Sequence, residues 1–119
     1  NRYNMSSQIM SNQNFLGKLL RHYREFNHLT LHELSLLIDI DSTLISKFET
    51  GSRVPTMQQI HKYAEGFNIR KETLIALRKA QVIIRKYGLN TTTLQAANIL
   101  LSINEKKDYF DVEKYIQKK

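Results

Sequence analysis

The sequence predicts an all-α fold, with five helices within residues 14–88 and a helical extension over residues 89–119. Three observations favour this class. Glycine and proline, which interrupt helices, number only 4 and 1 in 119 residues. Apolar residues recur three and four positions apart, and β-branched residues rarely alternate with polar ones, so the period is helical. Small polar residues suited to N-caps precede several of the apolar stretches.

Residues 1–13 are expected to form a flexible N-terminal segment. The sequence leaves open whether all of it is native, since Met5 and Met10 are both candidate start residues. The segment lacks the apolar region of a secretory signal, and no apolar run in the chain is long enough for a membrane span. The absence of cysteine excludes disulfides, thiolate zinc sites and cysteine nucleophiles, and it fits a reducing cytosol.

The first two helices are predicted at about residues 14–26 and from residue 31 onward. The apolar stripe of the first consists of Phe15, Leu16, Leu19, Leu20, Tyr23 and Phe26. The second follows Thr30, which forms a capping box with Glu33: the hydroxyl accepts from the third amide and the carboxylate reaches back. Its predicted apolar face consists of Leu31, Leu34, Leu37 and Ile38, and it ends near residues 39–41.

The third helix is predicted over about residues 42–50, with Asp41 or Ser42 as its N-cap. Its inward positions are Leu44, Ile45 and Phe48. Gly51 suits the left-handed conformation that ends a helix, and Pro55, the only proline, prevents continuation. This helix is therefore short and sharply bounded at both ends.

Two further helices are predicted at about residues 56–67 and 71–87, the second ending before Gly88. In the extension, threonines able to cap precede a sixth helix with Leu94, Ala97 and Leu101 on one stripe, and residues 111–119 predict a final, frayed helix. The extension has too many apolar side chains to leave in water. It either completes the core or buries against a second copy, and we expect it to be a dimerisation or partner-binding element.

The second and third helices are short and joined by about three or four residues, which is helix-turn-helix geometry. From residue 16 to residue 69 the chain resembles the Cro/C1-type (XRE-like) DNA-binding domain of bacterial and phage repressors. The matching stretches are "LGKLLRHYREF", "LTLHELSLLIDIDSTLISKFETGSRVP" and "IHKYAEGFNI". The resemblance implies a five-helix, lambda-repressor-like domain at residues 14–88, in a bacterial or phage-encoded cytoplasmic protein.

In the family, the first residues of the third helix read base edges in the major groove. The resemblance therefore implies base contacts from Ser42, Thr43, Leu44, Ser46 and Lys47. Hydroxyls can serve several bases, lysine can donate to guanine, and leucine can meet a thymine methyl group. Each residue also has a structural reading: a serine can cap a helix, and a lysine can be ordinary surface charge.

Other residues are assigned to the DNA backbone or to the fold. The family uses the loop after the third helix to bind phosphate, which implies such a contact for Arg53. Lys18 and Arg21 are candidate phosphate contacts on the first helix, and Lys62 is better read as solubilising charge. The resemblance also implies an ion pair between Arg24 and Glu49 that ties the first helix to the third.

The chain departs from the family pattern in ways that weaken the predicted DNA face. Leu31 occupies a position where the family usually has a phosphate-binding glutamine, and Asp39 one where it usually has glycine. The net charge is +7, but residues 1–69 have 7 basic and 6 acidic residues, so most of the excess lies in residues 70–119. A seven-residue repeat of Arg78 with Arg85 and of Lys79 with Lys86 forms either a polyanion-binding stripe or, as we favour, a solvated face.

The sequence thus predicts a transcriptional regulator, most simply a repressor that binds an inverted-repeat operator in double-stranded DNA as a homodimer. The alternative is an antitoxin or accessory module whose C-terminal helices bind another protein. No catalytic set, glycine-rich phosphate loop, cofactor signature or metal site is recognised, so no enzyme is expected. His28 and His32 are four positions apart, but the predicted helix start lies between them, which disfavours metal binding.

Overall fold

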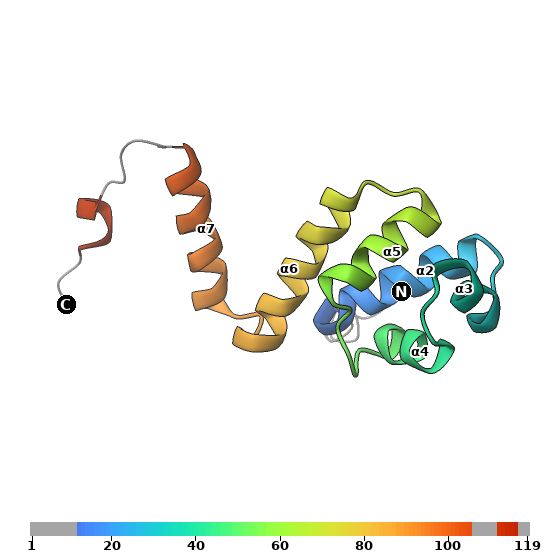
Figure 1. The fold of residues 1–119 in the computed structure, drawn as a ribbon. Coiled ribbons are helices and arrows are strands. Elements are labelled where there is room, and N and C mark those ends of the chain that lie inside the picture. The colour runs from blue at the N-terminus through green and yellow to red at the C-terminus, as the bar shows by residue number, and fades with distance from the viewer. Residues whose placement is uncertain (1–11, 106–111, 117–119) are drawn as a thin grey trace. The chain divides into compact units, whose positions relative to one another are not determined.

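The computed structural model describes residues 12–105 and 112–116, which form six α-helices and two 3-10 turns, with no strand among them (Figure 1). The elements are η1 (Asn12–Asn14), α2 (Phe15–Phe26), α3 (Leu31–Ile38), α4 (Ser42–Thr50), α5 (Met57–Phe67), α6 (Lys71–Tyr87), α7 (Thr91–Glu105) and η2 (Val112–Tyr115). The predicted all-α class is confirmed. The chain divides into two compact units, residues 1–86 and residues 87–119.

Two helices of the first unit begin with capping boxes. At α3 the Thr30 hydroxyl accepts from the Glu33 amide at 3.0 Å, and the Glu33 carboxylate accepts from the Thr30 amide at 2.8 Å. Hydrogen bonds to its charged form, above all the one from the Thr30 backbone, lower the pKa of Glu33. Thr56 and Gln59 form the same arrangement at the start of α5, which the sequence reasoning did not identify.

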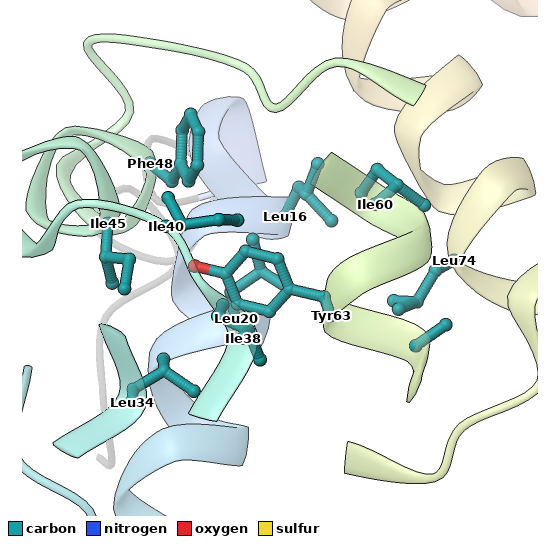
Figure 2. Packing of buried hydrophobic residues seen from close by; sticks show 11 residues of the cluster. Leu16, Leu20, Leu34, Ile38, Ile40, Ile45, Phe48, Ile60, Tyr63 and Leu74 are labelled. Atoms are coloured by element: carbon teal, nitrogen blue, oxygen red, sulfur yellow. The ribbon is translucent and has the colours of Figure 1, made fainter. Parts of the chain in front are cut away.

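One hydrophobic core holds the first unit together, and each of its five α-helices contributes to it (Figure 2). Its buried members are Leu16 and Leu20 of α2, Leu34 and Ile38 of α3, Ile45 and Phe48 of α4, Ile60, Tyr63 and Ala64 of α5, Leu74 of α6 and, outside the helices, Ile40. Burial of apolar surface contributes about 25 cal/mol of stability per Å², so this core is the main source of the stability of the first unit.

Two apolar residues predicted to face this core do not. Leu37 is 54% exposed because α3 turns Leu34 and Ile38 inward, and residue 37 lies roughly a quarter turn from the centre of that face. Phe26, the last residue of α2, is 73% exposed, and its ring stacks on that of His22 with centroids 6.1 Å apart. Both lie on the surface of the first unit.

Tyr63 carries the one buried side-chain polar atom that lacks a hydrogen-bond partner within the described residues. The residue is fully buried, and its hydroxyl oxygen points into the cluster of core side chains (Figure 2). Burial raises the pKa of this phenol well above its ordinary value of about 10, with a smaller contribution from the negative charge of Glu49. The hydroxyl therefore adds an uncompensated desolvation cost to the core.

Replacing Tyr63 with phenylalanine is expected to raise the free energy of unfolding by about 1 kcal/mol, because it removes that cost. Because the pKa of the Tyr63 hydroxyl is higher in the folded than in the unfolded chain, the unfolded chain loses the hydroxyl proton at a lower pH. The stability of the wild type therefore falls as the pH rises above about 10. The gain from the substitution should grow over the same range. Urea unfolding from pH 7 to pH 11 measures both effects. Tyr87→Phe, at an exposed position, is the control, and a loss of stability at neutral pH in Tyr63→Phe would contradict the prediction.

In the second unit, α7 begins at a cap that the sequence reasoning placed on threonine. The side-chain oxygen of Asn90 accepts from the Thr93 amide at 3.0 Å, so asparagine supplies the cap. No α7 side chain is buried, and the large apolar residues exposed there are Leu94, Leu100, Leu101 and Ile103. Of the final helix predicted over 111–119, residues 112–115 form a short 3-10 helix, and residues 111 and 117–119 lie outside the described residues.

The predicted flexible segment, residues 1–13, falls almost wholly outside the described residues. Residues 12 and 13 belong to η1, and the Gln13 carbonyl oxygen accepts a hydrogen bond from the Gln81 side chain at 2.7 Å. In the part of the chain that is described, no helix combines the length and the hydropathy needed to cross a membrane.

Candidate nucleic-acid interface

The turn between α3 and α4 is built on Asp39 and braced from α5. Asp39 adopts the left-handed conformation, with φ 55° and ψ 52°, which aspartate tolerates better than most residues other than glycine. The Lys62 ammonium group donates to the Asp39 carbonyl oxygen at 2.8 Å and lies 3.7 Å from a carboxylate oxygen of the same residue. Lys62, read from the sequence as solubilising charge, therefore supports the turn and offsets one of its acidic side chains.

The N-terminus of α4 is capped by Asp41 rather than by Ser42. The Asp41 carboxylate accepts from the Thr43 amide at 3.0 Å, and Ser42 is the first helical residue. A carboxylate is favourable at this end of a helix because the free amides and the macrodipole are positive there. The same carboxylate takes up an amide that a DNA phosphate could otherwise have used.

The five predicted base-contacting residues differ in exposure. Thr43 and Lys47 are exposed and one helical turn apart, so they share an outward face of α4. Ser42 and Ser46 are half-buried. Leu44 is also half-buried and packs against the hydrophobic core, which leaves only part of it available to a ligand. Thr43 and Lys47 are thus the most accessible of the set.

The C-terminus of α4 is fixed to α2 through a nearly buried ion pair. The Arg24 guanidinium donates to both carboxylate oxygens of Glu49, at 2.8 and 2.9 Å, and a third hydrogen bond joins it to the Leu29 carbonyl oxygen. The side chains are only 12% and 6% exposed. The hydrogen bond to Glu49 is the largest cause of the raised pKa of Arg24, so the arginine stays charged.

A second contact fixes the same end of the helix. The Asn14 side chain donates to the Glu49 carbonyl oxygen at 3.1 Å. Gly51 then ends α4 in the left-handed conformation at φ 88°, as predicted, and its amide bonds back to the carbonyl oxygens of Lys47 and Phe48. Helix α4 is therefore anchored at its end, while Thr43 and Lys47 face outward.

The loop that follows α4, residues 51–55, is held by two arginines of α6. Arg78 donates to the Pro55 carbonyl oxygen at 2.6 Å, and the Arg85 guanidinium donates to the carbonyl oxygens of Gly51 and Ser52. These two members of the seven-residue repeat thus bind the protein's own backbone, a role that the sequence reasoning did not consider. Arg53, the predicted phosphate contact, is exposed at the middle of this loop.

Gln81, on the same helix as these arginines, is a buried polar residue that sequence reasoning missed. It is 3% exposed, and its side chain accepts from the Leu16 amide at 3.0 Å as well as donating to the Gln13 carbonyl oxygen. It therefore satisfies one of the free amides at the start of α2. A polar residue within an otherwise apolar stretch of α6 was the only signal in the sequence.

The remaining predicted phosphate contacts lie on α2. Lys18 is exposed, and Arg21 forms an exposed ion pair with Glu25 at 3.0 Å. Leu31, which stands where the resembled family has glutamine, packs partly against the core instead. Within residues 12–105 and 112–116, no group of three or more histidine, aspartate or glutamate side chains could hold a metal ion.

Comparison with known families gives one result for this surface. A family model described as a helix-turn-helix domain matches residues 17–79, more than half of the 119-residue chain. The match includes α3, the turn at Asp39, α4 and the loop with Arg53. No curated protein and no solved structure matches this chain.

Proposed function

The chain belongs to the helix-turn-helix domain family, and on that premise we propose that it is a sequence-specific DNA-binding regulator of transcription, of the Cro/C1 type. The observation that carries the proposal is the outward face of α4. This helix is anchored by the Arg24–Glu49 pair, and it presents Thr43 and Lys47 to solvent. A rigid helix with exposed polar side chains is suited to the major groove of B-DNA.

We propose that Thr43 and Lys47 make the principal base contacts. Lysine can donate to guanine O6 and N7, and the threonine hydroxyl can donate or accept at several bases. Ser42 and Ser46 would contribute from the flanks of the same face, and the exposed part of Leu44 would meet a thymine methyl group. Arg53, Lys18 and Arg21 would bind phosphates, which positions the protein without reading the sequence.

The regulator is proposed to act in the bacterial cytoplasm as a homodimer and to repress transcription from an inverted repeat. Residues 89–119 would supply the dimer contact, because α7 exposes Leu94, Leu100 and Leu101. A two-fold dimer would place its α4 helices in major grooves about one turn, roughly 34 Å, apart. With a net charge of only +1 over residues 1–69, binding by one copy would be weak, so the second copy adds needed affinity.

Selection of the full-length protein on a random double-stranded DNA pool, at near-physiological salt, tests this function. The expected result is enrichment of an inverted repeat with half-site centres about 10 base pairs apart. Salt-sensitive binding without enrichment would contradict sequence-specific regulation. A single enriched half-site would support sequence reading and contradict the dimer.

Variants on α4 show which side chains read the sequence. Thr43→Ala and Lys47→Ala are expected to change the enriched bases and to weaken binding to the selected site by about 1–3 kcal/mol each. Lys71→Ala is the control, because it removes an exposed lysine that lies beside residues of α5 such as His61 and Glu65. If both α4 variants enrich the wild-type site with unchanged preference, these residues do not read bases.

A second candidate function is an antitoxin or accessory module that binds another protein through residues 89–119. The observation in its favour is that no α7 side chain is buried although the helix contains several large apolar residues. A stable complex of defined stoichiometry with a different protein, lost on Leu100→Glu and Leu101→Glu, would favour this function. A homodimer lost on the same substitutions would favour the first.

A further inference from the structure

A shallow concavity lies between the loop after α4 and the C-terminal half of α6. Its volume is about 500 Å³, and its lining consists of Ser52, Arg53, Val54, Val82, Arg85 and Lys86. Three of these six residues are basic and none is acidic. We propose that this concavity is a binding site for a backbone phosphate of DNA, with Arg53 and Lys86 as its ligands. This inference rests on the proposed function and adds α6 to the DNA-binding surface.

The shape of the site depends on Arg85. Its guanidinium donates to the carbonyl oxygens of Gly51 and Ser52, which fixes the loop against α6 next to Arg53. Arg78 holds the far end of the loop at Pro55. Arg85 therefore acts as a positioning residue whose positive charge still contributes to the potential of the concavity. Arg53 and Lys86, both exposed, provide the ionic groups that a phosphate would meet.

The charge distribution along α6 favours an anion at this place. The helix has five basic residues and one acidic residue, Glu72, in its first turn. Glu72 lies 14 residues from Lys86, roughly 21 Å along the helix axis. Within α6 itself, the charged residues near Lys86 are therefore basic, and their field is screened only beyond a Debye length of about 8–10 Å.

The position of the concavity also fits a strand of DNA that α4 has entered. The loop that forms one wall begins directly after α4, so its backbone and Arg53 lie at the end of the proposed reading helix. A phosphate bound here would place α6 beside the DNA backbone. This would supply charge that residues 1–69, with a net +1, lack.

The test is the salt dependence of binding to one fixed DNA duplex of about four helical turns, or about 42 base pairs. Each phosphate contact contributes about 0.9 to the slope of log affinity against log salt, or about 3.5-fold in affinity per fourfold change in salt. Lys86→Gln is expected to lower the slope by about this amount for each bound copy, and so by about twice as much for the proposed homodimer. Lys79→Gln, two turns away on α6 and outside the concavity, should stay near the wild-type slope.

The double variant Arg53→Gln with Lys86→Gln shows whether the two residues share one phosphate. A shared site predicts that the double variant loses about one contact per bound copy from the slope rather than two, because the phosphate is already lost in each single variant. Additive losses would mean separate phosphates and would overturn the shared site. Thermal unfolding of each variant checks that the fold is intact.

Two other outcomes distinguish a failure of the proposed phosphate site from a failure of the proposed DNA-binding function. Wild-type binding with equal slopes for Lys86→Gln and Lys79→Gln would overturn the site and leave the proposed function standing. No measurable DNA binding by the wild-type chain at low salt would overturn both.

Discussion

Replacing Glu49 with alanine is expected to lower the free energy of unfolding by about 3–5 kcal/mol. Arg24 would keep its charge at a position where it is only 12% exposed, and it would lose its hydrogen bonds to both carboxylate oxygens. A buried charge without its partner is among the most costly defects in a fold. Urea unfolding followed by circular dichroism measures the change. DNA affinity should fall with it, because the ion pair that helps to fix α4 against α2 is lost.

The control for this prediction is a second arginine–glutamate pair, which lies within α2 and is exposed. Arg21 and Glu25 are 3.0 Å apart, but their side chains are 60% and 55% exposed. Glu25→Ala should therefore change stability by less than about 1 kcal/mol. The double variant Arg24→Leu with Glu49→Leu should lose less than Glu49→Ala alone, because no unpaired charge remains. Equal effects at residues 25 and 49 would show that burial does not strengthen the pair.

Replacing Gly17 with alanine is expected to lower the free energy of unfolding by about 3 kcal/mol, at the upper end of the usual cost of an overpacked core. A β-carbon at this buried helical position would overlap the Phe48 carbonyl oxygen of α4 and both terminal atoms of the Asn14 amide. The backbone of α4 cannot shift easily, since Glu49 and Gly51 are both anchored. The usual helical advantage of alanine, about 1 kcal/mol, is too small to offset this.

Gly66→Ala provides the comparison for this substitution. A β-carbon at Gly66 would also make a close contact, but with the methyl group Cγ2 of the Ile38 side chain rather than with backbone. A side chain can move more readily, so the loss should be nearer to about 1 kcal/mol. Thermal unfolding of both variants ranks them. If Gly17→Ala is as stable as the wild type, α2 and α4 can separate without cost, and the proposed rigidity of the reading helix is wrong.

Most features that sequence reasoning predicted correctly are governed by neighbours in the chain. The Arg24–Glu49 ion pair, between residues 25 positions apart, was expected only from the family resemblance. The Thr30–Glu33 capping box joins residues three apart, and the left-handed conformation of Gly51 depends on local backbone sterics. The five helices between residues 15 and 87 follow from apolar periodicity in the same way. Each of these local features depends on residues a few positions apart, so it can be predicted without knowledge of the tertiary packing.

The features that were missed depend on partners far away in the sequence. Gln81 bonds to residues 65 and 68 positions before it, and Arg78 and Arg85 bond to carbonyl oxygens 23 to 34 positions before them. Every residue has a backbone carbonyl oxygen, whatever its side chain, so no sequence motif indicates which one accepts such a bond. The exposure of Leu37 was missed for a related reason, since it depends on how α3 rotates against the rest of the core.

The hydrogen bonds from α6 also have a consequence for the order in which the protein is completed. A ribosome adds roughly 5–20 residues per second, and N-terminal parts of a chain can begin to fold before later parts exist. Here α4 and its loop are made well before Arg78 and Arg85, which donate to carbonyl oxygens of that loop, and before Gln81, which accepts from the Leu16 amide at the start of α2. A nascent chain that ends at α5 thus has the helix-turn-helix sequence without the bonds that shape its loop. The first unit, residues 1–86, therefore reaches its final structure only when α6 has been synthesised.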